Sequence, residues 1–103
     1  MRRIFKYELT IEDVQVIETF TLFEPLSVKV QKGTPVLYAI VDDETVPAKV
    51  RIRTYGTGFA VEPYTMKYEY VGTYLLNEGD LVFHVFCQPY VHPSCNEDRK
   101  SVV

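Results

Sequence analysis

The residues best suited to bind a ligand form one run in the middle of the chain, residues 51–58. Read as a β-strand, this run places Arg51, Arg53 and Tyr55 on one face and then enters a Gly-Thr-Gly turn at 56–58. Arginine forks and the exposed amides of such a turn both suit phosphate oxygens. A tyrosine beside them can stack on a base. The run therefore predicts an anion-binding site in a chain whose formal net charge is −3.

An ordinary solvated strand face is the alternative interpretation of this cationic run. Lys49 continues the same face, and carboxylates on neighbouring strands could pair with all of its cations. The glycines also suit a plain turn, because glycine permits positive φ without a steric penalty. The sequence leaves both interpretations open.

His84 is a second candidate, within the strand-like run 81–86 (LVFHVF), where it shares a face with Val82 and Phe86. It is either a half-buried histidine hydrogen-bonded to backbone or a group that contacts a base or ribose. One histidine without a partner carboxylate or nucleophile does not make a hydrolase.

The spacings His84-x-x-Cys87 and His92-x-x-Cys95 contain the ligand types of a zinc site. Residues three apart in a strand project to opposite faces, so His84 and Cys87 do not converge easily. The acidic run 42–44 lies at an expected hairpin tip, where its charges favour solubility over acid catalysis. We therefore expect no metal, no cofactor and no catalytic residue, and we expect that the protein is not an enzyme.

Short strands joined by tight turns are expected to position these residues. The strands are predicted at residues 2–9, 14–20, 26–31, 35–41, 48–55, 66–76 and 81–87. Residues 32–33 (Lys-Gly) indicate a hairpin turn, and Pro25 is expected to interrupt the chain before the third strand. Gly72 indicates a bulge or a close backbone approach. The pattern predicts an all-β fold, a single small antiparallel sandwich or barrel of about seven strands.

Length and composition are consistent with one globular domain, expected at residues 1–90, followed by a proline-containing tail at 91–103. The acidic net charge argues against non-specific DNA or RNA binding, which needs a broad cationic surface. No stretch has the apolar length of a membrane span, and the N-terminus becomes polar too soon for a signal peptide. We expect a cytoplasmic protein with reduced thiols at Cys87 and Cys95.

Residues 35–41 (PVLYAIV) are apolar on both faces. Such a strand is either central and covered on both sides or part of a subunit interface. A domain of this length has few internal layers with which to cover both faces. We therefore expect a homo-oligomer.

Five segments together resemble a family of small single-domain proteins encoded by tailed bacteriophages. The segments are RRIFKYEL, KGTPVLYAIVD, RTYGTGF, YVGTY and LVFHVF, and the resemblance covers residues 2–86. The family often has histidine after Gly-Thr-Gly, where this chain has Phe59, so a role for an imidazole at that point is in doubt. The resemblance implies a phage accessory protein. Small phage domains of this kind include oligomeric sponges that trap cyclic oligonucleotide messengers of bacterial immunity without cleaving them.

Together, the residues and the resemblance predict a sponge for a messenger such as cyclic GMP-AMP, acting in the cytoplasm of the infected bacterium. The predicted ligand-binding residues are Arg51, Arg53, Tyr55, Gly56, Thr57, Gly58 and His84, together with Tyr7 and Lys6 of the IFKYEL segment. Two alternatives stay open: a module that inhibits a host protein or serves as a structural accessory, and a phosphodiesterase.

Overall fold

The computed structural model describes residues 1–88 and 92–93 of the chain. Among them the fold is all-β, with two short 3-10 turns and no α-helix. The strands are β1 (Arg2–Glu8), β2 (Val14–Phe20), β3 (Phe23–Gln31), β4 (Thr34–Asp42), β5 (Pro47–Gly56), β6 (Glu69–Leu76), β7 (Leu81–Cys87) and the two-residue β8 (His92–Pro93). The 3-10 turns are η1 (Pro63–Lys67) and η2 (Asn77–Gly79). No helix in this part of the chain has the length and apolar character needed to cross a membrane.

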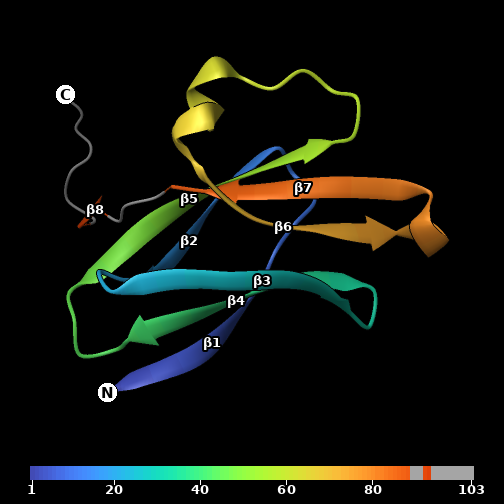
Figure 1. The fold of residues 1–103 in the computed structure, drawn as a ribbon. Helices are drawn as coiled ribbons and strands as arrows, with labels where there is room; N and C mark the ends of the chain where they lie inside the picture. The colour runs from blue at the N-terminus through green and yellow to red at the C-terminus, as the bar shows by residue number, and fades with distance from the viewer. Residues whose placement is uncertain (89–91, 94–103) are drawn as a thin grey trace.

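The strands form two antiparallel sheets that pack against each other, with the first sheet below the second in Figure 1. The first sheet has the order β1-β4-β3. The second has the order β2-β5-β7-β6, and β8 pairs with the beginning of β5. This arrangement confirms the predicted small β-sandwich.

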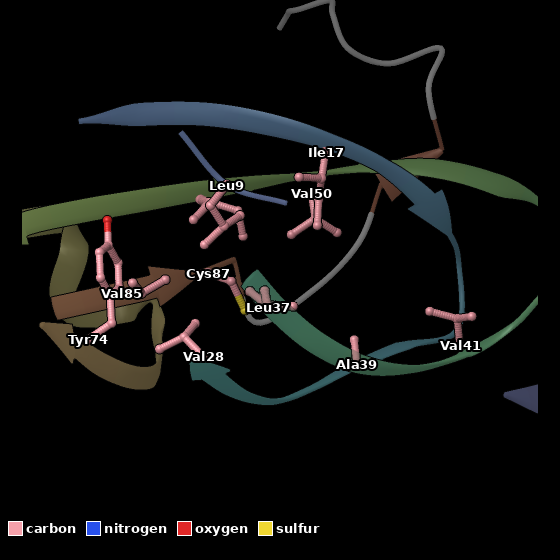
Figure 2. Packing of buried hydrophobic residues seen from close by; sticks show 11 residues of the cluster. Leu9, Ile17, Val28, Leu37, Ala39, Val41, Val50, Tyr74, Val85 and Cys87 are labelled. Atoms are coloured by element: carbon pink, nitrogen blue, oxygen red, sulfur yellow. The ribbon is translucent and has the colours of Figure 1, made fainter. Parts of the chain in front are cut away.

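The core lies between the sheets, where each strand contributes every second side chain. Figure 2 shows side chains from both layers pointing into this space. The buried cluster consists of Leu9, Ile17, Val28, Leu37, Ala39, Val41, Val50, Ile52, Tyr74, Val85 and Cys87. Val50 and Ile52 of β5 are fully buried, as the predicted alternation requires. The opposite face of β5 therefore points away from the core.

The turn between β3 and β4 is the predicted tight hairpin. Lys32 and Gly33 have φ values of 51° and 82°, the positive angles that a two-residue hairpin turn with matching twist needs. Pro25 differs from the prediction, because it lies inside β3, which begins at Phe23. The ladder shifts register between Pro25 and Ser27, and this bulge accommodates a residue that has no amide hydrogen to donate.

Gly72 is both a bulge and a point of close approach. The ladder between β6 and β7 shifts register between Tyr70 and Gly72. A Cβ atom at Gly72 would lie 2.9 Å from Cγ2 of Val28 in β3, so only hydrogen fits there. Gly72 thus lets β6 of the second sheet close against β3 of the first. β6 itself starts later than predicted, at Glu69, because Pro63 fixes the first residue of η1 before it.

β4 is the central strand of the first sheet, and its two faces differ. Leu37, Ala39 and Val41 point inward and are fully buried. On the outer face Val36 is also buried, between its cross-strand neighbours Glu8 and Lys29. Part of the second apolar face is therefore covered within one chain, and the homo-oligomer stays a prediction.

Candidate ligand-binding site

The outer face of β5 presents the predicted cationic row. Arg51 is exposed, whereas Arg53 and Tyr55 are half-buried. β5 lies between β2 and β7, so these side chains stand in the middle of the sheet and have neighbours on both sides. The structure thus brings Arg51, Arg53 and Tyr55 together as the sequence predicted.

Aromatic side chains surround this row on β7 and β6. The register places Phe86 opposite Arg53, His84 opposite Tyr55, and Tyr70 opposite Phe86. Directly opposed residues of antiparallel strands share a face. The Phe86 ring lies 6.1 Å from the Tyr55 ring and 5.5 Å from the Tyr70 ring, both in edge-to-face contact. Three strands therefore contribute to one arginine-containing aromatic surface.

The segment that contains η1 folds back over this surface. The Tyr64 ring lies 4.6 Å from Cζ of Arg53, in cation–π contact. The hydroxyls of Tyr55 and Thr65 are hydrogen-bonded, 2.7 Å apart, and Thr65 is buried. The arginine–tyrosine site, as we call this group, consists of Arg51, Arg53, Tyr55, Tyr64, Tyr70, His84 and Phe86.

The arginine–tyrosine site has no carboxylate counter-charge among the described residues. All three ion pairs found there lie at the first sheet, such as Arg3 Nε to Asp43 Oδ2 at 3.0 Å. None of them involves Lys49, Arg51 or Arg53. In residues 1–88 and 92–93, the cross-strand ion pairs of an ordinary solvated face are therefore missing.

The register of β2 explains this lack of ion pairs. Val16 stands opposite Arg51 and Val14 stands opposite Arg53, so the neighbouring strand offers no carboxylate to either arginine. Glu18 stands opposite Lys49, but no ion pair joins the two side chains. Both arginines keep their charge available for another partner.

Arg53 and Tyr55 shift each other's pKa. Burial opposes the charge on Arg53 more than any other single cause, but hydrogen bonding to the Tyr55 hydroxyl, together with the nearby Tyr64 hydroxyl, raises its pKa on balance. Burial likewise opposes ionisation of Tyr55, yet hydrogen bonds from Thr65 and Arg53 lower its pKa. Arg53 Nε is buried without a hydrogen-bond acceptor in the described structure. Within the described residues, the fold therefore leaves one donor of this guanidinium unsatisfied.

His84 is held by hydroxyl groups. Its Nε2 lies 2.7 Å from Oγ1 of Thr57, and its Nδ1 lies 2.9 Å from Oγ1 of Thr73. The Thr73 hydroxyl also contacts the Tyr70 hydroxyl at 2.6 Å. The expectation of backbone partners for a half-buried histidine is therefore wrong here. The ring connects the Gly-Thr-Gly turn to β6, and both of its nitrogens are occupied.

The turn 56–58 offers fewer free amides than the sequence predicted. Gly58 has a φ of 91°, so the glycine is needed for the turn itself. The Thr57 amide donates to the Val82 carbonyl at 3.1 Å, and the Phe59 amide donates to the Gly56 carbonyl at 3.1 Å. One amide of the expected anion cradle, that of Thr57, is thus used within the chain, as is the amide of the following Phe59. Contacts to an anion fall chiefly to the arginine side chains.

The structure does not bring Lys6 and Tyr7 to this site. Both lie on β1, which pairs with β4 in the first sheet. The Tyr7 hydroxyl is hydrogen-bonded to Oγ1 of Thr19 at 2.7 Å, and Lys6 donates to Oε1 of Gln31 at 2.9 Å. Sequence alternation places residues on faces, but it does not reveal which strands share a sheet.

Sequence reasoning missed Tyr64 and Tyr70. Tyr64 lies in a segment expected to be a loop, and alternation carries no information about how a loop folds back. The bulge at Gly72 changes the phase of β6, so simple alternation along the expected strand misassigns the faces on one side of it. Gly72, as a marker of a bulge, was the sequence feature that could have revealed the face of Tyr70.

Cys87 and His84 point to opposite faces of β7, as alternation predicted. Cys87 is fully buried, and burial raises the pKa of its thiol to about 12. The described residues contain no cluster of three metal-ligating side chains. Cys95 and the expected tail lie outside the described residues except for His92–Pro93.

A hollow away from this site is lined mostly by the first sheet, including Arg2, Glu24 and Ile40, together with Glu69 of β6. Its one arginine has two carboxylates in the same lining, so the hollow carries its own counter-charges. It suits an anion less well than the arginine–tyrosine site.

Comparison with known proteins gives one match. None of the curated proteins and none of the solved structures matches the chain. One family model, described as a domain of unknown function (DUF7352), matches residues 1–94. This match covers the strands that build both sheets and the whole arginine–tyrosine site. The chain therefore belongs to the DUF7352 family.

Proposed function

We propose that this protein captures a phosphate-bearing nucleotide on the arginine–tyrosine site and holds it without cleaving it. The observation that carries the proposal is a pair of arginines that lack carboxylate partners in the described structure and stand among aromatic rings. A guanidinium pairs well with phosphate, and aromatic rings stack on bases. A small anion with flat bases satisfies both kinds of group.

A cyclic oligonucleotide fits this arrangement better than a single phosphate does. Arg51 and Arg53 are two residues apart on one strand, which separates their Cα atoms by about 7 Å. Tyr64, Tyr70 and Phe86 flank them on other elements. A ligand with at least two phosphates and two bases would use both arginines and more than one ring.

Capture without turnover is favoured by the partners of His84. Cleavage of a phosphodiester needs a positioned base and acid, or a metal with its ligands. Both nitrogens of His84 face threonine hydroxyls, and the Asp42–Glu44 region lies at the turn of the first sheet beside Arg3. Stoichiometric binding is the simpler activity for such a site.

The resemblance to tailed-phage proteins supplies the biological setting of the proposal. A protein that sequesters cyclic oligonucleotide messengers, such as cyclic GMP-AMP, would blunt a bacterial immune response. It would act in the cytoplasm of the infected host, as a homo-oligomer and without a cofactor.

Thermal shift with a panel of cyclic di- and trinucleotides tests the proposal. A bound ligand raises the melting temperature by mass action, and Arg53→Gln should abolish most of that rise while the matched variant Arg3→Gln keeps it. Ligand recovered intact after denaturation supports capture. An unchanged melting temperature at millimolar ligand argues against nucleotide binding, and multiple-turnover formation of linear nucleotide would make the protein an enzyme.

A protein ligand is the second candidate, favoured by the apolar groups around the arginines. Val16 is 50% exposed and Met66 is 84% exposed, and Tyr70 and Leu75 are exposed as well. Exposed apolar side chains around arginine are typical of protein interfaces. If the nucleotide panel does not shift the melting temperature, a cross-linker placed at position 66 in infected cells would identify such a partner.

A further inference from the structure

We infer that β1 is the edge through which two copies of this chain join into a two-fold dimer, with the two β1 strands antiparallel and centred on Phe5. The inference gives a surface and a register to the predicted self-association. It rests on the backbone and charges of the first sheet and is independent of the nucleotide proposal.

The backbone of β1 has a free side. β1 is the terminal strand of its sheet and pairs only with β4 among the described residues. The Leu9 amide donates to the Pro35 carbonyl at 2.9 Å, and the same register continues through β1. Alternate residues of an antiparallel strand bond to the same neighbour. The odd-numbered residues of β1 therefore bond to β4, and the even-numbered residues direct their N–H and C=O groups to the free edge.

The charges on these even-numbered residues select one register. Centred on Phe5, the dimer places Arg2 opposite Glu8 of the second copy and Ile4 opposite Lys6 of the second copy. Each pair occurs twice by symmetry, and all four side chains are exposed in one chain. A shift in one direction would place Arg2 opposite Lys6, and a shift in the other would place Lys6 opposite itself. Like charges directly opposite each other are unfavourable. A register centred on Tyr7 would pair Lys6 with Glu8, but it overlaps only residues 6–8 of the strand. The register centred on Phe5 is therefore the one that pairs opposite charges over the whole of β1.

The same register also continues the core. Phe5 and Tyr7 point inward and pack partly buried against the hydrophobic cluster. In the dimer, Phe5 would face Phe5 of the second copy, and aromatic cross-strand pairs are favourable. The three-stranded sheets of two copies would then form one continuous six-stranded sheet with about eight new backbone hydrogen bonds.

β2, which ends the second sheet, lacks this self-complementarity. The two remaining terminal strands, β3 and β6, lie against each other. The Thr54 amide donates to the Asp13 carbonyl, so the even-numbered residues of β2 face its free edge. These residues are Val14, Val16, Glu18 and Phe20. A two-fold pairing of β2 would form no opposite-charge pair, so charge would not favour any of its registers.

Proline substitution tests which edge is used. Ile4→Pro and Val16→Pro each replace an exposed aliphatic residue and remove one outward amide, on β1 and on β2 respectively. Sedimentation velocity from about 1 µM to 1 mM should give a dimer for the parent and for Val16→Pro, and a folded monomer for Ile4→Pro. A parent protein that is monomeric throughout overturns the inference, as does a dimer that Ile4→Pro leaves intact.

Charge exchange tests the register and covers the case in which a proline variant fails to fold. Arg2→Glu and Glu8→Arg should each weaken the dimer by about tenfold, because each replaces two attractive pairs with two repulsive ones. The double variant, which exchanges both charges, should return to the parent affinity. The control Glu78→Arg, on the distant turn between β6 and β7, should change nothing. A double variant as weak as the single variants contradicts this register.

The dimer proposal and the nucleotide proposal are tested by separate measurements. Ligand-induced thermal shift in monomeric Ile4→Pro reports on nucleotide binding alone, and sedimentation without ligand reports on β1 alone. Either result can be negative while the other is positive.

Discussion

The two sheets carry similar numbers of cations but treat them differently. On the first sheet, Arg3 lies 3.0 Å from Asp43 and Lys6 donates to Gln31 at 2.9 Å. On the second, Arg51 and Arg53 have valines across the ladder, and Arg53 has a tyrosine ring beside its guanidinium. On the first sheet both of these cations have a partner within the chain, whereas the outer face of the second sheet leaves its two arginines for a ligand.

This difference shows that a count of cations does not identify a binding face. Exposed charged side chains with partners of their own gain little from a new ligand, because the old contact must break first. A half-buried guanidinium without a counter-charge gains a full charge-assisted hydrogen bond. The partners of each arginine therefore distinguish the faces better than the arginines themselves.

The largest expected effect contrasts one arginine from each sheet. Arg53→Gln should weaken nucleotide binding by about 1 to 3 kcal/mol, because a charged donor is lost from a partly dry site. Arg3→Gln, on the first sheet, should leave the affinity unchanged. Isothermal titration with the ligand found in the panel measures both, and equal affinities for the two variants would place the anion site elsewhere.

A carboxylate added to the outer face of the second sheet should pair with an arginine there, as Asp43 pairs with Arg3 on the first sheet. Val16→Glu puts an acid directly opposite Arg51, where a cross-strand ion pair can form. The new pair competes with the ligand and should weaken binding by about 1 kcal/mol, and Val16→Gln serves as the uncharged control. If Val16→Glu binds as tightly as Val16→Gln, Arg51 does not contact the ligand.

Removal of the ring beside Arg53 should have a smaller effect. Tyr64→Leu loses the cation–π contact that orients the guanidinium, and binding should weaken by about 0.5 to 1 kcal/mol. Tyr64→Phe keeps the ring and should bind nearly as well as the parent. The same titration decides this, and a Tyr64→Phe variant as weak as Tyr64→Leu would assign the effect to the hydroxyl.

The smallest expected effect belongs to the acidic turn of the first sheet. The Glu44 amide and the N-terminal amine hydrogen-bond to Asp42 and lower the pKa of its carboxyl. Because the folded-state pKa is lowered, the stabilisation is present above the ordinary aspartate pKa and is lost as pH falls through the folded value. Thermal melts of Asp42→Ala and the parent should therefore differ slightly at neutral pH and converge below about pH 4. A difference that grows in acid would contradict this.

The sequence predicted the fold better than it predicted the site, for a physical reason. Alternation and glycine turns act locally, so strands such as β2 and β7 were predicted with their observed bounds. Pairing between distant strands depends on the whole core, and it separates Lys6 and Tyr7 from the arginines. The fold-back that places Tyr64 beside Arg53 is a contact between a loop and a sheet, which no periodicity records.

The order of strand pairing has a consequence for synthesis of the chain. β1 pairs with β4 and β2 pairs with β5, so the first two strands leave the ribosome before their partners exist. The hairpins β3–β4 and β6–β7, by contrast, join neighbours through short turns and need little loop closure. We expect these hairpins to form first during translation. The N-terminal strands would then be the segments that chaperones meet in the nascent chain.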